Sequence, residues 1–184
     1  MDFNKQIALI LHELDTTLHN IDTRQINIAI QLLQEHDRIF LTALGRAGFM
    51  GKSFMMRLMH MGKEVYILGE TNTPNFTASD LLIICSGSGE TNQFIQAAHK
   101  AKNLGGKLLL FTAAKGTTLD KLADGTIHLK APSKNQENSQ FQSVQPMASL
   151  FEQAILLTGD AMILALMSQA SNKDTMFQRH SNLE

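Results

Sequence analysis

The chain has 184 residues, of which 43% are hydrophobic and 18% charged, and its formal net charge is −1 at pH 7. These values describe one ordinary globular domain without the basic field that nucleic acids require. The single cysteine excludes an internal disulfide, and no cluster of cysteines or histidines suggests a metal or another cofactor. Residues 1–5 lack the features of a signal peptide, and the longest apolar stretch, 154–167, falls short of the ~20 residues of a membrane span. We therefore expect a cytoplasmic protein with neither a membrane nor a nucleic acid as partner.

The first predicted elements are two amphipathic helices within residues 3–35. Apolar residues recur at helical spacing in residues 3–19. Asp22 or Thr23 can cap a second helix, because short polar side chains accept the free N–H groups of a helix start.

From residue 38 onward, short apolar runs alternate with helical patterns. The predicted strands are 38–44, 65–68, 81–86, 108–112 and 126–129, and the predicted helices between them are 49–61, 90–104 and 118–123. Strands without polar alternation that are separated mostly by helices indicate a parallel sheet covered on both faces. The predicted fold class is therefore α/β, a three-layer sandwich with a five-stranded parallel sheet flanked by helices, whose α/β core spans residues 38–131.

The last part of the chain begins with a polar loop, residues 132–145, which is either a flexible linker or a loop ordered by a partner. A long helix follows over residues 147–169, and it is apolar around most of its circumference. One domain of this size has difficulty covering such a helix, so the pattern favours a homo-oligomer. We interpret residues 1–184 as a single domain that ends in a short tail.

Two strand-to-helix junctions carry the chemistry. The first is residues 44–48, Leu-Gly-Arg-Ala-Gly, and the second is residues 85–91, Cys-Ser-Gly-Ser-Gly-Glu-Thr. Glycine-rich turns at helix starts present converging backbone N–H groups and the positive end of the helix dipole to an anion. The hydroxyls of Ser86, Ser88 and Thr91 suit the oxygens of a phosphomonoester, so a sugar phosphate is the first ligand to consider. Both junctions lie at the carboxyl ends of strands, where ligands bind in such folds.

Each junction also has a simpler interpretation. Gly45, Gly48 and Gly51 have neither the spacing of a P-loop nor that of a dinucleotide fingerprint, which argues against nucleotide binding. Arg46 can engage a phosphate or sugar hydroxyls, or it can form an ordinary surface salt bridge. The hydroxyls of the second junction can merely cap a helix. Glu90 is expected to point away from a phosphate and to complement the helix dipole.

Glu152 lies early in the long apolar helix, where a carboxylate can serve as a base near neutrality. The alternative is a glutamate that only stabilises the first turns of that helix. Two histidines also have distinctive positions. His60 ends the helix that follows the first junction, and His180 stands in the C-terminal tail, whose default state is a frayed terminus.

Five segments together resemble the 6-phospho-3-hexuloisomerase family of the sugar isomerase (SIS) superfamily. They are the two junctions and residues 56–62, 69–74 and 179–184, which occur in the family's order along nearly the whole chain. The resemblance implies a homotetramer with active sites at subunit boundaries and no metal. It implies interconversion of D-arabino-3-hexulose 6-phosphate and D-fructose 6-phosphate through a cis-enediol, in the ribulose monophosphate pathway of formaldehyde fixation.

The resemblance also implies a role for each candidate residue. The second junction would hold the phosphate, the first would line the sugar, Glu152 would be the base, and two histidines would approach the sugar oxygens, His180 from a neighbouring chain. The family usually has serine after the arginine of the first junction, where this chain has Ala47. The candidate substrate-binding residues are Gly45, Arg46, Ser86, Gly87, Ser88 and Thr91, and the candidate catalytic residues are Glu152, His60 and His180.

Two other functions share these features. One is isomerisation of a different phosphosugar, such as a pentose 5-phosphate. The other is a non-catalytic SIS regulator that binds a sugar phosphate. The low basic charge and the lack of a helix-turn-helix segment argue against a regulator that binds DNA itself.

Overall fold

The computed structural model describes residues 2–134, 141–169 and 175–183. The two N-terminal helices are each capped by an aspartate, because the Asp2 side chain accepts the N–H of Lys5 and the Asp22 side chain accepts the N–H of Arg24. The helices are α1 (Phe3–His19), α2 (Thr23–Glu35), α3 (Gly45–His60), α4 (Asn92–Asn103), α5 (Thr118–Leu122), α6 (Ser149–Gln169) and α7 (Thr175–Gln178). The strands are β1 (Arg38–Ala43), β2 (Glu64–Ile67), β3 (Leu81–Cys85), β4 (Lys107–Thr112) and β5 (Gly125–His128).

The five strands form one parallel sheet in the order β2-β1-β3-β4-β5. This confirms the predicted fold class. The chain moves outward from β1 to β2, returns to β3 and then continues in the opposite direction, so the strand order reverses between β1 and β3. The register pairs Ala43 with Cys85, which are the last residues of these two strands. The two glycine-rich junctions therefore start side by side, at the point where open α/β sheets bind ligands.

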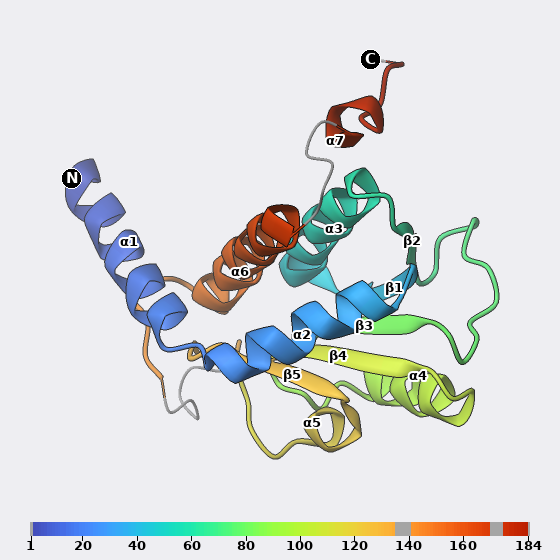
Figure 1. Ribbon diagram of the computed structural model, residues 1–184. Helices are drawn as coiled ribbons and strands as arrows, with labels where there is room; N and C mark the ends of the chain where they lie inside the picture. Colours follow the sequence, from blue (N-terminus) through green and yellow to red (C-terminus); the bar gives the residue numbers. More distant parts are fainter. Residues whose placement is uncertain (1, 135–140, 170–174, 184) are drawn as a thin grey trace.

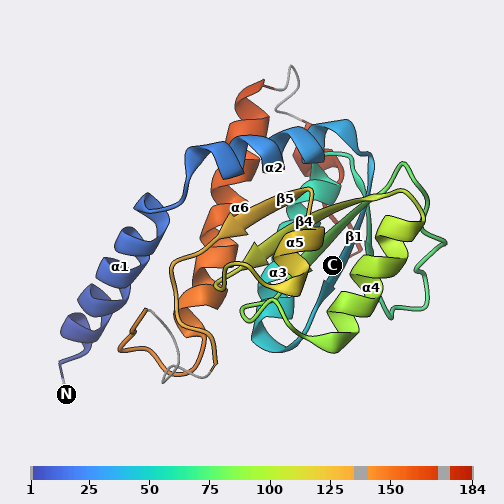
Figure 2. The same ribbon diagram turned by 90° about the horizontal axis from the view of Figure 1, so that it is seen from below.

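Helices cover both faces of the sheet, and each face has its own apolar cluster. Figure 1 shows α3 and α6 on one side of the sheet and α4 and α5 on the other. Within β1, Ile39 and Leu41 pack with the α2, α3 and α6 side, whereas Phe40 packs with the α4 and α5 side. Alternate residues thus serve opposite clusters, which explains why the strand sequences are apolar without interruption. The first half of α1 extends away from this body (Figures 1 and 2).

Most element ends lie within two residues of the prediction, and three differences matter for the site or the tail. Helix α3 begins at Gly45 rather than Phe49, because Gly45 adopts a φ of +59° and turns the chain directly from the strand into the helix. Gly48 permits this tight turn, since a Cβ there would lie 3.2 Å from the carbonyl oxygen of Ala43. Helix α4 begins at Asn92, so residues 86–91 form a true loop. The tail contains the short helix α7, which the sequence did not predict.

The polar segment 132–145 is described only at its two ends, and residues 135–140 of the predicted loop lie outside the described residues. Its second end is bound to α1 through Glu13. The carboxylate of Glu13 accepts the Val144 N–H at 2.7 Å, the Ser143 hydroxyl at 2.8 Å and the Gln145 side-chain amide at 3.0 Å. These bonds join the approach to α6 to the N-terminal helix.

Helix α6 confirms the predicted helix over 147–169 to within two residues, and it extends beyond the apolar stretch 154–167 at both ends. By length and composition its segment Ser149–Ser168 could cross a membrane, and 56% of that segment is buried inside the protein. It packs against α3, and the two helices approach closely where Gly159 meets the ring of Phe54. A core helix explains the same composition, because its apolar circumference lies largely against other helices.

We predict that Gly159→Ala destabilises the fold by about 1 kcal/mol. A Cβ at this position would lie 2.9 Å from Cδ2 of the buried Phe54 side chain. The cost of overpacking, about 1–3 kcal/mol, exceeds the ~1 kcal/mol that alanine gains over glycine in a helix. Urea unfolding at a fixed protein concentration measures the difference. In a Phe54→Leu background the same substitution should cost less, and an equal cost in both backgrounds would contradict the proposed contact.

Candidate active site

A cavity of about 420 Å³ opens where the strand order reverses. Both junctions, the first turn of α6 and the segment that follows β5 contribute to its wall. It is lined by Leu44, Arg46, Ala47, Cys85, Ser86, Gly87, Ser88, Thr91, Phe94, Ser133, Lys134, Ala148, Phe151 and Glu152. Six of the nine candidate residues therefore share one cavity, whose volume lies in the range of small-molecule sites. Gly45 belongs to the same turn but does not itself line the cavity, and His60 and His180 lie elsewhere.

Two of the three hydroxyls of the second junction bind backbone N–H groups of the loop, and the third makes no capping bond. Ser86 Oγ accepts the N–H of Gly89 at 3.2 Å, and Ser88 Oγ accepts the N–H of Glu90 at 3.3 Å. Both serines thus brace the loop with their oxygens while their O–H groups can still donate to a ligand. Thr91 is the N-cap residue of α4, yet its side chain makes no capping bond. The capping interpretation therefore does not account for the Thr91 hydroxyl.

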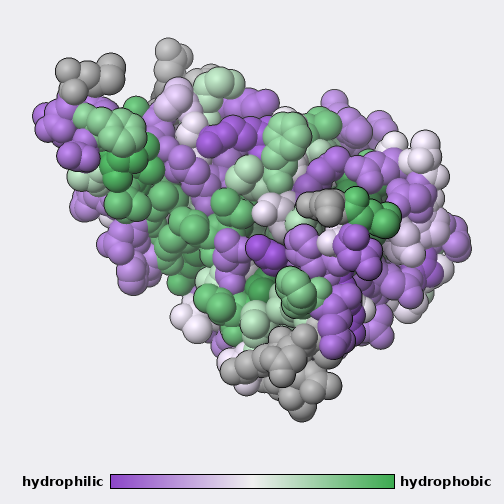
Figure 3. All heavy atoms as spheres, turned by 90° about the horizontal axis from the view of Figure 1, so that it is seen from above, coloured by the Kyte–Doolittle hydropathy of each residue, from purple (hydrophilic) through white to green (hydrophobic). Residues whose placement is uncertain are grey.

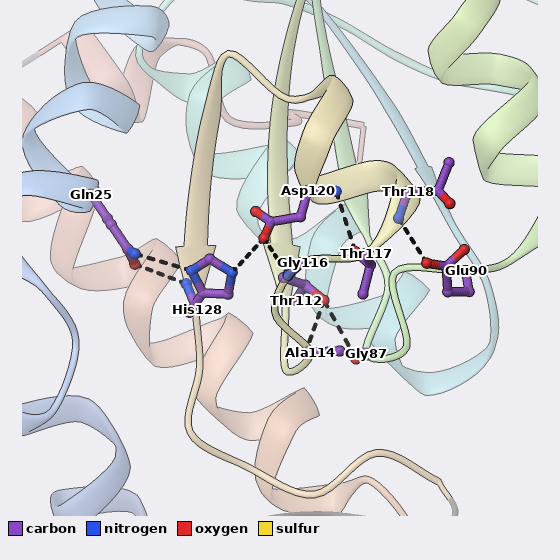
Figure 4. Close-up of polar contacts among 10 residues, drawn as sticks. All are labelled: Gln25, Gly87, Glu90, Thr112, Ala114, Gly116, Thr117, Thr118, Asp120 and His128. Atoms are coloured by element: carbon purple, nitrogen blue, oxygen red, sulfur yellow. Dashed lines mark hydrogen bonds and ion pairs between the residues drawn. The ribbon is translucent and has the colours of Figure 1, made fainter.

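The loop is supported from behind by the start of α5 and its N-cap residue Thr117 (Figure 4). The carboxylate of Glu90 accepts the N–H of Thr118 at 2.7 Å, and this bond lowers the pKa of Glu90. The N–H of Leu119 donates to the Gly89 carbonyl at 3.2 Å. Gly89 has a φ of +63°, and a Cβ there would overlap Thr117. Glu90 therefore points away from the cavity, as predicted, but it complements the start of α5 rather than that of α4.

Further polar contacts connect α5 to β5, the strand at the edge of the sheet. His128 of β5 lies 3.3 Å from the Asp120 carboxylate through Nε2, and its backbone N–H donates to Gln25 at 3.0 Å (Figure 4). Asp120 also accepts the N–H of Gly116 at 2.8 Å. These contacts join α2, β5 and α5, so the wall behind the loop is held by three elements.

Arg46 and Glu152 meet across the cavity. Arg46 lies in the first turn of α3 and Glu152 in the first turn of α6, and the guanidinium donates to Glu152 Oε2 at 2.6 Å. The Glu152 side chain is largely buried, whereas that of Arg46 is about half exposed. Within the described residues no further hydrogen bond uses the Glu152 carboxylate, so Oε1 remains for a ligand. The other N–H groups of the guanidinium can bind ligand oxygens.

Cys85 also lines the cavity, at the end of β3. Burial raises the pKa of its thiol to about 12. The thiol is therefore neutral at physiological pH, and this residue is not an activated nucleophile.

His60 and His180 lie together, but not at this cavity. Their rings stack with centroids 5.3 Å apart and planes inclined by 19°. Arg179 adds a 3.4 Å hydrogen bond to the His60 carbonyl, so the tail binds the C-terminal end of α3. His60 is 14 residues beyond Arg46 on the same helix, a distance of ~21 Å along the axis. Burial, together with the nearby Arg57 and His180, lowers the pKa of His60, so its ring is neutral at neutral pH.

Sequence reasoning did not single out Ser133, Lys134 or Phe151 as residues of the site. The first two follow β5, whose carboxyl end lies on the same edge of the sheet as the two junctions. Their position after a predicted strand was the available signal. Phe151 had none, because the packing of α6 positions its ring beside Gly87.

Comparison with known proteins agrees with this geometry. Residues 31–157 match the SIS domain family, a segment that contains both junctions and Glu152. The chain is 42% identical over 186 residues to a 3-hexulose-6-phosphate isomerase from Bacillus subtilis, with all of both chains covered. It is 32% identical over 184 residues to a 3-hexulose-6-phosphate isomerase from Mycobacterium gastri, covering all of this chain and 92% of the relative.

A solved structure has a similar fold over nearly the whole chain. The crystal structure of a protein from Methanococcus jannaschii, for which a function of 3-hexulose-6-phosphate isomerase was inferred, matches with a TM-score of 0.82. The identity is 29%, and the match covers 98% of this chain and 99% of that chain. The parallel sheet, the two junctions at its reversal point and the similarity along the entire sequence lead to one conclusion: this chain belongs to the SIS domain family.

Proposed function

We propose that this protein is a 3-hexulose-6-phosphate isomerase that interconverts D-arabino-3-hexulose 6-phosphate and D-fructose 6-phosphate. The observation that carries the proposal is the single cavity in which a hydroxyl-rich loop faces the Arg46–Glu152 pair. The names of the relatives that match along the full chain support it. The proposal places the enzyme in the cytoplasm and in the ribulose monophosphate pathway of formaldehyde fixation.

The proposed chemistry moves a carbonyl from C3 to C2. Glu152 Oε1 removes the proton from C2, which gives a cis-enediolate with its negative charge on O3. The O2–H proton then moves to O3 through the cis-enediol, and the same carboxylate returns its proton to C3 as the carbonyl forms at C2. The developing negative charge on the sugar oxygen is stabilised by N–H groups of Arg46 that do not bind Glu152. Arg46 has a second effect, since its bond to Oε2 orients the carboxylate before the substrate binds.

The phosphate end of the substrate would lie in the second junction. Ser86, Ser88 and Thr91 offer hydroxyl donors, and the start of α4 adds backbone N–H groups and the positive end of its dipole. Glu90 does not oppose this, because its charge is directed to Thr118 on the far side of the loop. Ala47 lines the cavity beside Arg46 and contributes a methyl group instead of a hydroxyl.

The proposed enzyme is a homo-oligomer, and a tetramer is proposed from the family resemblance. Exposed apolar residues support the assembly. On α1 the exposed apolar residues form one stripe, and others lie on the outer surfaces of α3 and α6. Figure 3, which shows the face formed by these helices, has a band of hydrophobic residues across it. The exposed large hydrophobic residues of these helices are Phe3, Ile7 and Leu11 of α1, Phe49 and Met56 of α3, and Leu157 and Leu164 of α6. A second copy of the chain would remove this surface from water.

The first test is an assay of the purified protein for fructose 6-phosphate formation, with a panel that includes pentose 5-phosphates. A higher rate of turnover with the 3-hexulose 6-phosphate than with the other sugars supports the proposal. Preference for another phosphosugar would reassign the substrate, and binding without any turnover would indicate a regulator.

Glu152→Gln should lower kcat by about 10²-fold or more, because the amide cannot take the C2 proton. The fold and the affinity for fructose 6-phosphate should be retained, since the amide has nearly the same shape. Steady-state kinetics and calorimetry measure the two effects. Glu35→Gln, at the exposed end of α2, is the matched control and should be fully active. Near-normal turnover of the Glu152 variant would remove this residue from the mechanism.

Thr91→Val should weaken fructose 6-phosphate binding by about 10-fold or more, because it removes a hydroxyl donor to a charged group. Stability should be unchanged, since the Thr91 side chain makes no capping bond. Thr71→Val in the exposed β2–β3 connection is the control for loss of a threonine hydroxyl. Calorimetric titration measures the affinity of each variant for fructose 6-phosphate. Unaltered affinity of the Thr91 variant would exclude Thr91 from phosphate binding.

His180 should act on the cavity of a neighbouring subunit. The tail is bound to the C-terminal end of α3, ~21 Å along the helix axis from Arg46, and His180 does not line its own chain's cavity. Glu152→Gln and His180→Ala variants should each be impaired alone. Refolded together, they should recover on the order of a quarter of wild-type activity, because random pairing makes half of the pairs mixed, with one complete site in each. An active His180→Ala enzyme, or mixing without recovery, would contradict this role.

A further inference from the structure

The charges that line the active-site cavity leave one cation unpaired. Arg46 is neutralised by Glu152 at 2.6 Å, so this pair contributes no net charge. A phosphomonoester near neutral pH carries a charge of about −1.5 to −2. Among the described residues that line the cavity, Lys134 is the remaining cation.

Lys134 lies in the segment that follows β5, next to Ser133, and it is exposed. Other lysines of the chain have carboxylate partners: Lys102 and Lys107 bind Asp124, and Lys63 binds Asp37. Within the described residues the ammonium of Lys134 has neither an ion pair nor a hydrogen bond. The side chain is thus free to move toward a ligand without first breaking a contact.

We propose that Lys134 binds the phosphate group of the sugar phosphate as its principal side-chain cation, and so determines the preference for phosphorylated over unphosphorylated sugars. The inference rests on the proposed function, because it assumes that the phosphate lies in the loop of residues 86–91. In that position the hydroxyls and the backbone N–H groups of the loop would contact the phosphate from one side. Lys134, in the wall formed by the segment after β5, would contact it from another.

Two other lysines lie close to the loop but outside the cavity. Lys115 and Lys130 line an adjacent cavity of about 320 Å³, which shares Gly87 and Ser133 with the active-site cavity. Lys130 donates to Asn20 at 3.0 Å, so its ammonium is already engaged. Lys115 has the same charge as Lys134 in a neighbouring wall, which makes it a matched control for the general positive field near the loop.

The experiment compares Lys134→Ala, Lys134→Arg and Lys115→Ala with the wild-type enzyme. For Lys134→Ala we expect KM to rise about 10-fold, on the scale of one charge-assisted contact at a partly exposed site, with kcat within about two-fold. The inhibition constant of inorganic phosphate should rise in parallel. Lys134→Arg should restore most of the affinity, and Lys115→Ala should change KM less than about two-fold.

Three results would overturn the proposal. They are an unchanged KM in Lys134→Ala, an equal rise in KM in Lys115→Ala, and a loss confined to kcat. Calorimetric binding of fructose 6-phosphate separates this proposal from the proposed activity. If the wild-type protein binds fructose 6-phosphate through Lys134 but does not isomerise it, the binding role stands and the activity fails. If the wild-type protein isomerises and Lys134→Ala is normal, the activity stands and the binding role fails.

Discussion

The parallel pairing of β1 with β3 is the constraint on which the site depends. The register places Ala43 opposite Cys85, so the chain leaves both strands at the same edge of the sheet. It then turns to opposite faces, since α3 covers one side and α4 the other (Figure 1). This divergence opens a space between two helix starts, and both starts present N–H groups to it. Helix α6 closes that space and brings Glu152 to Arg46.

The hydroxyl-rich loop is held by contacts that never touch the cavity. Glu90 binds the backbone of Thr118, and Gly89 has no room for a side chain against Thr117. An acidic residue beside a phosphate loop would normally weaken anion binding by repulsion. Here its charge is used behind the loop, where it connects the loop to α5. Rigid loops bind anions better because less freedom is lost when the ligand arrives.

A single chain leaves part of its apolar surface exposed and two of its candidate catalytic residues away from the cavity. Helix α1 extends from the body with Phe3, Ile7 and Leu11 exposed, and α6 exposes Leu157 and Leu164. The two histidines at the far end of α3 are equally separated from their own cavity. Both observations have the same explanation under the proposed assembly, in which a second copy covers the helices and supplies or receives the histidines.

The sequence by itself determined the fold class, and it predicts an anion site at the second junction. Apolar runs of strand length separated by helices specify a parallel sheet, because such strands must be covered on both faces. A loop with three hydroxyls after a buried strand indicates an anion site, because local backbone geometry creates it. These inferences need only short-range chemistry, which explains why the SIS resemblance and the five-stranded sheet were confirmed.

Only the tertiary structure decided which distant residues meet. Arg46 and Glu152 are 106 residues apart in the chain, and no local pattern states that α6 crosses the start of α3. Lys134 lines the cavity because of the position of β5 in the sheet, and no motif in the sequence predicts this. His60 and His180 were separated from the cavity by the length of α3, which no motif shows. Sequence patterns record the covalent neighbours of a residue, whereas the contacts that form the site depend on how whole helices pack on the sheet.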